Sequence, residues 1–377
     1  MIANCLQENL AKGLSIVGKA VASKSTLPAI TNVLIETDDS RLKLAATNLE
    51  IAITCWIAAK VEEAGAITVP ARLFSEFVNS LPNDTIEMRL NARTRTLNLN
   101  CARYEANLKG IDADEFPPIP HVSDIPAGEI DPRVLEEAIN QVAFAAAVDD
   151  TRPVLAGVLA SFNEDTLTLA AADGFRLSVR KVNLAKPVST KFDMIIPARA
   201  LHELARIASD EEDPIQIAVT PNRSQVLFHM KNVELVSRLI EGTFPNYQQI
   251  IPQRYATRTV LTTADFLKAT RIASFFARDS SNIVKLQVQP GDELAPGKLT
   301  VAATSAETGD TVSGIDAIVE GDNAQIAFNA KYLIDVLGVL DTSQVALEVM
   351  SPSSPGVVKP VGSDNFIYVI MPMHTSR

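Results

Sequence analysis

Two runs of acidic residues are the first groups in this sequence whose chemistry could serve catalysis or metal binding. Asp149-Asp150 and Asp210-Glu211-Glu212-Asp213 supply clustered carboxylates, the groups that hold divalent cations and act as general acids and bases. Neither run has a histidine partner, and neither has a second carboxylate at the spacing of metal ligands. We therefore expect both runs to be solvated loops, and we expect neither a metal site nor a catalytic site.

The cysteines and histidines are too scattered to predict a reactive site. Cys5, Cys55 and Cys101 form no C-x-x-C pair, and the four histidines lie far apart in the sequence. This pattern argues against a disulfide scaffold, a structural zinc site and a Ser-His-Asp triad. The sequence also has no glycine-rich phosphate loop, which argues against nucleotide hydrolysis by this chain. We predict a protein that is not an enzyme and needs no cofactor.

Length and composition predict a soluble protein of several domains. The 377 residues suffice for two or three domains, and 47% hydrophobic residues can fill their cores. No run approaches the roughly 18 apolar residues that span a bilayer, and the first residues lack the pattern of a secretory signal. These features favour a reducing compartment, the cytoplasm. The net charge of −11 argues against a protein that coats nucleic acid, unless its basic residues are segregated on one surface.

The most specific signal in the sequence is a threefold internal repeat. Strand-like segments recur at residues 42–47, 167–172 and 299–304, with offsets of 125 and 132. Segments that run from a strand into a helix recur at residues 67–73, 194–200 and 326–332, with offsets of 127 and 132. Two unrelated segments that share one period indicate three tandem copies of a whole domain.

Two proline-bearing linkers separate the copies. Phe116-Pro117 and Phe244-Pro245 lie 128 residues apart, and each follows a strand-like run. We therefore predict domains at residues 1–120, 125–250 and 255–377.

Each repeat should contain two helices and several antiparallel strands, which is an α+β fold. Apolar residues at helical spacing, from Leu6 to Val21, predict the first helix, and Leu73, Phe77 and Leu81 predict one side of the second. The six expected helices span residues 6–24, 71–81, 132–147, 198–208, 264–278 and 330–340. Together they carry a net charge of +4, whereas the rest of the chain carries −15. The helices therefore form a candidate basic surface, although a charged solvent face is the ordinary alternative for any one of them.

Five short motifs, together with the repeat, are specific enough to identify a resemblance. They are Ser25-Thr26-Leu27-Pro28, Thr151-Arg152-Pro153-Val154-Leu155, Asp173-Gly174-Phe175-Arg176-Leu177, Gly242-Thr243-Phe244-Pro245-Asn246-Tyr247 and Tyr368-Val369-Ile370-Met371-Pro372-Met373. With these motifs the chain resembles, over its whole length, the bacterial DNA polymerase III beta subunits, the beta sliding clamp family. The resemblance implies three tandem domains of one topology, with two helices per domain inside and antiparallel sheets outside. It also implies that two chains assemble head to tail into a closed ring, a DNA clamp.

The resemblance implies the function of a processivity factor. The ring would encircle duplex DNA, slide along it, and tether the catalytic subunit of the replicative DNA polymerase through a peptide-binding pocket. The implied partners also include a clamp loader, and other polymerases and repair proteins that carry clamp-binding peptides. DNA would be held topologically by diffuse phosphate contacts, without reading of bases. A basic lining within an acidic exterior would also account for the charge count.

The resemblance further implies a partner-peptide pocket that the C-terminal tail lines in part. The matching residues are Arg152, Leu155, Ala172, Gly174, Phe175, Leu177, Pro245, Ile250, Val369, Met371 and Met373. Methionines repack readily, so such a pocket would accept several short apolar peptides. The family often has His where Phe175 stands and Arg where Gln249 stands, and both positions bear on the fine specificity for peptides. From composition alone, the tail would be an edge strand.

A DNA-facing surface and a ring interface complete the candidate sites. The candidate DNA contacts are Lys12, Lys19, Lys24, Arg72, Arg199, Arg206, Lys268, Arg271 and Lys331, of which Lys24 matches a basic loop position of the family. The candidate interface residues are Phe74, Phe77, Leu108, Phe275 and Phe276. The residues alone leave a solvated face open for the basic side chains and a core position open for Phe275-Phe276.

Two other functions also stay open on the sequence alone. The first is a cytosolic enzyme with its active site at a domain junction, although no repeat carries a catalytic constellation. The second is a peptide-binding scaffold unrelated to DNA, which would need no basic helix faces.

Overall fold

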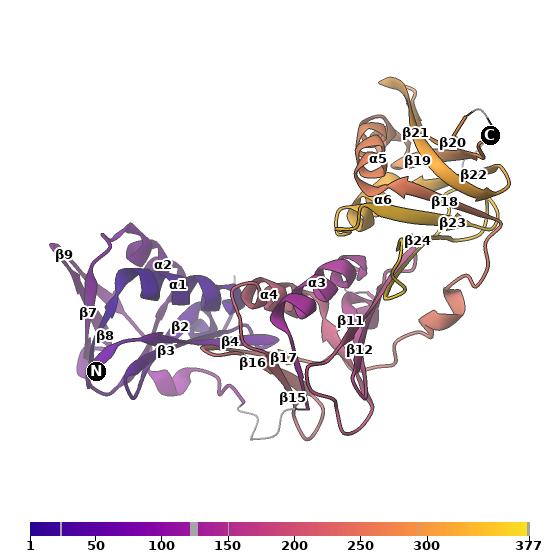
Figure 1. Cartoon of the computed structure of the whole chain (residues 1–377). Coiled ribbons are helices and arrows are strands. Elements are labelled where there is room, and N and C mark those ends of the chain that lie inside the picture. Colours follow the sequence, from indigo (N-terminus) through magenta and orange to yellow (C-terminus); the bar gives the residue numbers. More distant parts are fainter. Residues whose placement is uncertain (23–24, 121–126, 150, 294, 375–377) are drawn as a thin grey trace. The chain divides into compact units, whose positions relative to one another are not determined.

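The structure, a computed structural model, describes residues 1–22, 25–120, 127–149, 151–293 and 295–374. It contains three copies of one α+β domain, each with two helices and a set of antiparallel strands (Figure 1). The predicted fold class is therefore confirmed. The chain divides into two compact units, and the division passes through the second repeat. The first unit comprises Met1–Arg133, Leu184–Ser189 and Glu203–Leu239, and the second comprises Val134–Asn183, Thr190–His202 and Ile240–Arg377.

The first repeat lies wholly in the first unit. Its elements are β1 Ile2–Leu6, α1 Gln7–Val17, β2 Asn32–Asp38, β3 Arg41–Thr47, β4 Ile51–Ala58, β5 Lys60–Glu63, β6 Ala66–Pro70, α2 Ala71–Ser80, β7 Thr85–Asn91, β8 Thr96–Cys101 and β9 Tyr104–Lys109. Leu10, Leu14 and Val17 form the buried stripe of α1. Gly13 lies on the same stripe, where a Cβ atom would come within 2.7 Å of Cδ1 of Leu44. The absence of a side chain therefore lets α1 lie close to the sheet.

The second repeat has the same order of elements except that no strand corresponds to β5. They are β10 Gly128–Ile130, α3 Pro132–Val142, β11 Gly157–Asn163, β12 Thr166–Ala172, β13 Arg176–Asn183, β14 Phe192–Pro197, α4 Ala198–Ala208, β15 Ile215–Val219, β16 Gln225–His229 and β17 Val233–Arg238. Asp131 begins α3, because its Oδ1 accepts a hydrogen bond of 2.9 Å from the backbone N–H of Arg133.

The third repeat lies wholly in the second unit. Its elements are β18 Thr257–Thr262, α5 Thr263–Ala277, β19 Ile283–Gln289, β20 Gly297–Ser305, β21 Gly309–Gly321, β22 Ala324–Asn329, α6 Ala330–Leu337, β23 Gln344–Val349, β24 Gly356–Pro360 and β25 Phe366–Ile370. Asn329 begins α6, because its Oδ1 accepts a hydrogen bond of 2.9 Å from the N–H of Lys331.

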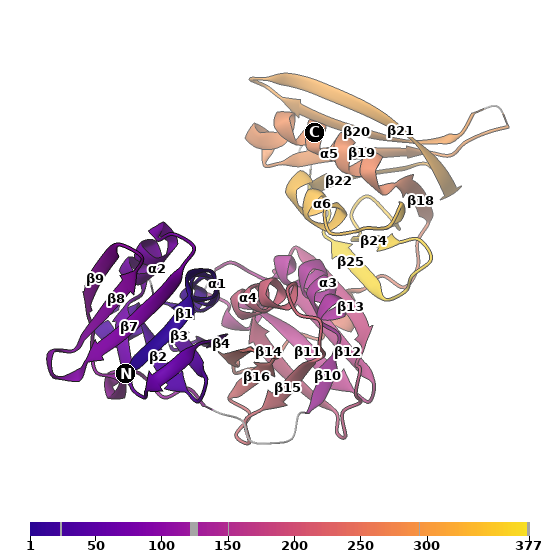
Figure 2. The same cartoon turned by 60° about the vertical axis from the view of Figure 1, so that its left-hand side comes forward.

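Strands of neighbouring repeats join in shared sheets. The first unit holds a sheet in the order β5-β1-β7-β8-β9 and another in the order β10-β15-β16-β17-β4-β3-β2-β6. The second unit holds one sheet in the order β14-β11-β12-β13-β25-β24-β23-β18-β21-β20-β19-β22, part of which Figure 2 shows. In the first unit Leu235 of β17 lies opposite Ile53 of β4, and in the second Tyr368 of β25 lies opposite Ser178 of β13. The last strand of one repeat thus pairs with the third long strand of the preceding repeat, which is the third strand after the first helix of that repeat.

Equivalent backbone hydrogen bonds fix the correspondence between the repeats. The N–H of Ile111 donates to the carbonyl of Thr68 at 2.9 Å, and that of Ile240 donates to Ile195 at 2.8 Å. In the third repeat the N–H of Met373 donates to the carbonyl of Ala327 at 2.8 Å. Ile111, Ile240 and Met373 therefore occupy one position of the common fold.

The six predicted helices are all present. The predicted ranges 6–24 and 132–147 extend beyond the ends of α1 and α3. The chain after α1 continues as a short 3-10 helix, Gly18–Ala20, and that after α3 as Ala143–Ala145. On α2, Leu73 of the predicted apolar side is 53% exposed, whereas Phe74 and Val78 are fully buried. Two apolar stripes, one residue apart, run along this helix, and their spacing alone does not say which one faces the core.

Candidate functional site

An apolar groove of about 600 Å³ opens on the second unit. Its lining comes from the turn between β12 and β13, the linker after β17, the turn between β23 and β24, and the end of β25. The lining residues are Ala172, Gly174, Phe175, Arg176, Leu177, Gln249, Ile250, Ile251, Pro252, Arg254, Met350, Ser354, Pro355, Val369 and Met371. Phe175 is 57% exposed, Ile250 53% and Met350 52%. Large apolar side chains that converge on a groove and face water are typical of a binding site.

A tight turn presents Phe175 to the groove. Oδ1 of Asp173 accepts hydrogen bonds from the N–H of Phe175 at 2.9 Å and from that of Arg176 at 3.0 Å. Between them, Gly174 has a φ of +94°, which favours glycine. Nη1 of Arg152 donates to the carbonyl of Asp173 at 2.8 Å and lies 3.1 Å from where a Cβ of Gly174 would be. The turn is therefore held in place from both sides.

The tail after β25 is attached to the same turn. The N–H of Met371 donates to the carbonyl of Phe175 at 2.9 Å, which places both side chains at the groove. The N–H of Met373 bonds farther along, to Ala327. The tail is thus ordered by backbone hydrogen bonds through Met373, and the lining it supplies is part of the fold.

A buried charge network supports the groove from beneath. The guanidinium of Arg176 donates from Nε to Asp173 at 3.0 Å and from Nη1 to Asp335 at 2.6 Å. Its Nη2 donates to the carbonyl of Phe144 at 2.8 Å. The side chain of Arg176 is only 7% exposed and lies over the ring of Tyr332, 4.4 Å from the centroid. With its donors engaged and both carboxylates close, Arg176 fixes the turn to α6.

Tyr368 completes this network from β25. Burial raises the pKa of its phenol far above the usual range, so the hydroxyl stays protonated. It donates a hydrogen bond of 3.1 Å to the carbonyl of Tyr332. β25, which contributes to the lining of the groove, is therefore hydrogen-bonded to α6, the helix that Arg176 also contacts.

The structure brings together most of the predicted pocket residues. Seven of them line the groove: Ala172, Gly174, Phe175, Leu177, Ile250, Val369 and Met371. Leu155 packs on the apolar cluster beneath it, and Arg152 supports its turn. Pro245 and Met373 are not in the lining. Whether this groove binds a peptide stays a prediction.

Sequence reasoning missed seven lining residues: Arg176, Ile251, Pro252, Arg254, Met350, Ser354 and Pro355. Three of them lie between β23 and β24, in a Ser- and Pro-rich stretch that marks a loop. Because β24 pairs with β25, this loop comes beside the tail. A hairpin assignment for the last strands would have been the signal that could find them.

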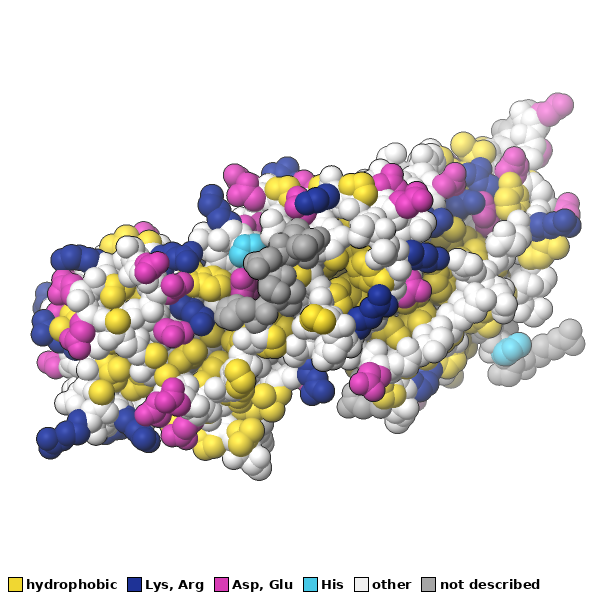
Figure 3. Space-filling model, turned by 90° about the horizontal axis from the view of Figure 1, so that it is seen from below, with side chains coloured by type: hydrophobic (Ala, Val, Ile, Leu, Met, Phe, Trp, Pro, Cys, Tyr) yellow, Lys and Arg dark blue, Asp and Glu magenta, His cyan; other side chains and the backbone are white. Residues whose placement is uncertain are grey.

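The candidate DNA contacts are exposed, but they differ in their partners. All eight that the structure describes have exposed side chains, and Lys24 lies outside the described residues. Arg72 pairs with Glu76 at 2.8 Å and Arg206 with Glu203 at 2.7 Å. Within the described part of the chain, five make no ion pair: Lys19, Arg199, Lys268, Arg271 and Lys331. On the face that Figure 3 shows, Lys and Arg side chains lie among Asp and Glu side chains.

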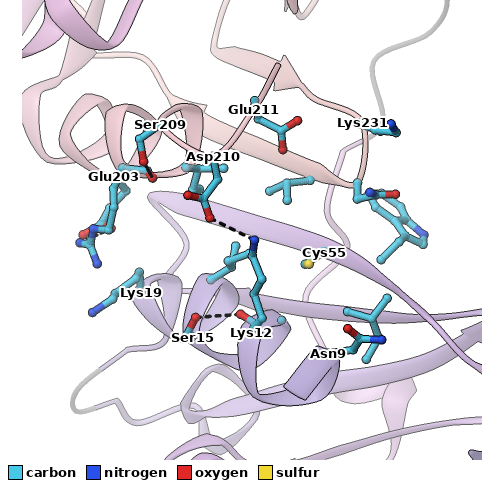
Figure 4. Close-up of a pocket in the computed structure, with 18 of the residues that line it drawn as sticks. Asn9, Lys12, Ser15, Lys19, Cys55, Glu203, Ser209, Asp210, Glu211 and Lys231 are labelled. Atoms are coloured by element: carbon cyan, nitrogen blue, oxygen red, sulfur yellow. Dashed lines mark hydrogen bonds and ion pairs between the residues drawn. The ribbon is translucent and has the colours of Figure 1, made fainter. Parts of the chain in front are cut away.

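Lys12 faces a second cavity, of about 850 Å³, within the first unit. Figure 4 shows Lys12 reaching from α1 to Asp210, which follows α4, and the two groups lie 3.1 Å apart. Nζ of Lys231 lies 3.9 Å from Asp213 in the same acidic run. Burial, and then repulsion from Asp213, raises the pKa of Glu211. The run is a largely exposed loop, as expected, and two of its carboxylates pair with lysines at the surface.

The other acidic run also has a partner. Asp149 accepts hydrogen bonds from Thr151 and from Nη2 of Arg152, the latter at 2.9 Å. These bonds lower the pKa of Asp149 to about 2. Asp149 is therefore a structural anion of the loop before β11, and its neighbour Asp150 lies outside the described residues.

The five candidate interface residues divide into exposed and buried groups. Phe275 is 60% exposed, and Phe77 is partly exposed. Phe74 is fully buried and Leu108 is 5% exposed, so both pack the core of their own chain. Phe276 packs partly against the core of the third repeat. Phe74 and Leu108 therefore offer almost no side-chain surface to a second chain, and their assignment to an interface stays a prediction.

The described residues show no site for a metal ion and no helix long and apolar enough to cross a membrane. No group of three or more potential ligand side chains gathers among them. The longest helix, α5, has 15 residues. The three cysteines are buried and free.

Comparison with known proteins gives matches along nearly the whole chain. Residues 1–120 match the family described as DNA polymerase III beta subunit, N-terminal domain. Residues 129–246 match its central domain and residues 248–374 its C-terminal domain. The predicted domain boundaries themselves stay a prediction.

Curated relatives and solved structures agree with these families. The beta sliding clamp of Bacillus subtilis (strain 168) is 31% identical over 379 residues, which cover 98% of each chain. That of Staphylococcus aureus (strain Mu50 / ATCC 700699) is 34% identical over 95% of each chain. A crystal structure of the DNA polymerase sliding clamp from Bacillus subtilis superposes with a TM-score of 0.93, at 30% identity and full coverage of both chains. The beta subunit from DNA polymerase of Streptococcus pyogenes gives 0.92 at 25% identity, also over both whole chains.

Proposed function

The chain belongs to the DNA polymerase III beta subunit family, the beta sliding clamps, and we propose which of its surfaces carry out the work of that family. Its function is that of a DNA replication processivity factor that encircles DNA, and it is a non-catalytic subunit. The surfaces to assign are the one that binds partner proteins, the one that closes the ring, and the one that faces DNA.

The groove on the second unit is the site for partner peptides. The observation that carries this assignment is the convergence of exposed Phe175, Ile250, Met350 and Met371 on one cavity of about 600 Å³. Burial of one or two peptide side chains there offers about 1.5–3 kcal/mol each. Met350 and Met371 adapt their shape, so peptides of different sequence can share the groove. The replicative polymerase, other polymerases, repair proteins and a clamp loader would use it one at a time.

Two unpaired strand edges suggest how two chains close a ring. Within the chain, β17 pairs with β4 and β25 pairs with β13, each time a last strand with a third long strand. The remaining last strand, β9, lies at the edge of its sheet. The remaining third strand, β21, pairs only with β20 over residues 309–317. Pairing of β9 with β21 of a second chain would repeat the same junction twice and leave neither edge open.

The repeat also predicts the register of this pairing. Ala106 occupies the position of Leu235 and Tyr368, five residues before Ile111, Ile240 and Met373. Asp310 occupies the position of Ile53 and Ser178 in the third long strand. With Ala106 opposite Asp310, two exposed apolar residues, Tyr104 and Val312, lie opposite each other. The same register places Lys109 opposite Glu307. Both pairs would favour the contact.

Helix side chains extend the proposed interface. Phe275 and Ile272 are exposed on α5, and Leu73 is exposed on α2. Tyr332 stands in the third repeat where Leu73 stands in the first, and Phe144 stands in the second where Phe275 stands in the third. The guanidinium of Arg176 lies over both rings in the second unit, 5.3 Å from the centroid of Phe144 and 4.4 Å from that of Tyr332. We therefore place Leu73 and Phe77, rather than Phe74, against Phe275 of the other chain.

The exposed basic residues of the helices face duplex DNA in this proposal. Lys19, Arg199, Lys268, Arg271 and Lys331 make no ion pair within the described part of the chain, so phosphates can reach them at little cost. Diffuse phosphate contacts of this kind are independent of base sequence and let a clamp slide. In this proposal the chain works on DNA in the cytoplasm.

Removal of the tail tests the peptide site. Deletion of Met371 to Arg377 removes two backbone hydrogen bonds but leaves Tyr368 and Ile370 in the core. We expect a folded protein that loses at least tenfold in affinity for a short Gln- and Leu-containing peptide from a polymerase tail, measured by isothermal calorimetry.

The matched control is a shorter deletion, of residues 374–377, which keeps Met371 and Met373. It should bind the peptide like the full chain. Unchanged affinity after the longer deletion would show that the tail is merely structural and that the peptide site lies elsewhere.

A further inference from the structure

We propose that the groove recognises a carboxylate on its partner peptide, and that Arg254 is the residue that binds it. This inference rests on the proposed peptide site and adds the chemistry of the partner. The observation behind it is the charge of the lining, which combines an apolar surface with one accessible cation and no acidic side chain.

Arg176 and Arg254 are the two cations among the lining residues, and only one of them can meet a ligand. Arg176 is 7% exposed and spends its donors on Asp173, on Asp335 and on a backbone carbonyl. Arg254 has an exposed side chain and forms no hydrogen bond or ion pair with the described residues. Arg254 is therefore the available charge of the groove.

The position of Arg254 puts this charge beside the apolar surface. Ile250, Ile251 and Pro252 precede it on the same linker and also line the groove. The ring of Pro252 restricts the backbone just before Arg254, so the guanidinium is carried by a stiffened segment. An extended peptide that buries apolar side chains on Ile250 and Met371 would thus bring its neighbouring residues near Arg254.

A carboxylate is the group that this arrangement fits best. The planar guanidinium offers a fork of N–H donors that matches the two oxygens of a carboxylate. No Asp or Glu among the lining residues competes for Arg254, and Gln249 adds a neutral donor and acceptor. The carboxylate can belong to an Asp or Glu side chain or to the C-terminus of a peptide that ends in the groove.

A matched set of peptides tests the assignment on the full chain. The peptides are variants of one acetylated, amidated hexapeptide with Leu and Phe anchors. Each acidic peptide carries Asp at one of the remaining positions, and its neutral partner carries Asn at the same position. A further Asn peptide ends in a free carboxylate. Affinities are measured by calorimetry for the wild type, for Arg254→Gln, and for the control Arg223→Gln, which removes an exposed cation that does not line the groove.

We expect the wild type and Arg223→Gln to bind at least one Asp peptide, or the free-acid peptide, about 2–5-fold more tightly than its neutral partner at low salt. In Arg254→Gln this ratio should fall to about one. Which peptide shows the ratio identifies the source of the carboxylate, and either source supports the proposal.

Two results would overturn it, and they differ from failure of the peptide site itself. A ratio near one for every peptide in the wild type, or a ratio that survives Arg254→Gln, would exclude recognition by Arg254 while leaving the groove a peptide site. Absence of binding by any peptide would instead overturn the assignment of the groove.

Discussion

The two strand junctions within the chain share one backbone plan but differ in the side chains that fill them. In the first unit, Asn48 accepts hydrogen bonds from the N–H of Glu50 and Ile51, and the N–H of Arg238 donates to Glu50. In the second unit, Asp173 holds the equivalent turn, and Met371 donates to Phe175. The same turn and the same strand pairing thus occur twice.

The two strand junctions differ in the side chains that lie between the paired strands and the neighbouring helices. Arg176 stands 125 residues after Ile51, and Phe144 stands 125 after Lys19, the offset that also relates the repeated strands. The second unit therefore fills this space with a buried cation that packs on two aromatic rings. The first unit has a cavity of about 850 Å³ there, crossed by the exposed pair of Lys12 and Asp210. A few substitutions on one backbone yield either a buried ionic support for the apolar groove or an open, charged cavity.

Removal of Arg176 should give the largest effect on stability. Arg176→Met leaves Asp173 and Asp335 without their cation, with side chains only 13% and 26% exposed. Breaking a buried ion pair by removing one partner costs about 3–5 kcal/mol. Urea unfolding should show a loss of that order for Arg176→Met. The matched change in the first unit, Lys12→Met, removes one partner of an exposed pair and should cost less than about 1 kcal/mol. Equal losses in the two variants would contradict the contrast between the junctions.

The proposed junction between chains should respond next most strongly. Phe275→Asp places a charge on an exposed ring position that we assign to the interface, and burial of such a ring contributes about 1.5–3 kcal/mol. The dimer dissociation constant should therefore rise about 10- to 150-fold, as measured by sedimentation equilibrium. Phe276 is left intact because it packs against the core.

Ile318→Asp is the control for this change. Ile318 is 69% exposed on β21, at a position that already pairs with Val260 of β18. It should leave the dissociation constant unchanged. A dimer that tolerates Phe275→Asp, or one that Ile318→Asp dissociates equally, would overturn the interface.

The sequence predicted the repeated parts of the molecule well and the junctions less well. The strand-to-helix segments and all six helices could be found because their patterns are local and occur three times. The choice between Leu73 and Phe74 could not, since it depends on which side of α2 meets the sheet. The pairing of Lys12 with Asp210 and that of Arg176 with Asp335 could not be predicted either, because these partners come together only when separate repeats pack.

Cys55 should make stability depend on pH above pH 9. It lies in the cavity of the first unit, and burial raises the pKa of its thiol to about 11, with Lys12 lowering it and Glu211 raising it to lesser extents. Between pH 9 and 11 the unfolded thiol loses its proton while the folded one keeps it. The unfolded state then binds fewer protons, so stability falls as pH rises through this window.

The contribution of Cys55 can be isolated by substitution. Between pH 8 and pH 10 the wild type should lose about 1 kcal/mol more stability than Cys55→Ala, measured by urea unfolding at each pH. Identical losses would mean that Cys55 is not shielded from water in the folded chain.

Asp210 should have the smallest effect on stability, but a specific effect on DNA binding. Lys12 and Asp210 lie 3.1 Å apart with side chains 65% and 64% exposed, so Asp210→Asn should change stability by less than about 1 kcal/mol. The substitution frees Lys12 for a phosphate, and one additional phosphate contact steepens the plot of log affinity against log salt by about 0.9. Fluorescence anisotropy on a short labelled duplex, over a range of salt concentrations, measures this slope.

Two further variants make the result specific to Lys12. Lys12→Ala combined with Asp210→Asn should return the slope to the wild-type value, because the freed cation is gone. Asp213→Asn removes a carboxylate of the same run that lies 3.9 Å from Lys231, and it should leave the contact of Lys12 with Asp210 in place. A slope that stays constant in Asp210→Asn would mean that Lys12 does not face DNA. A slope that steepens equally in Asp210→Asn and in the double variant would mean that the acidic run repels DNA as a whole, and that the cavity of the first unit does not control one cation.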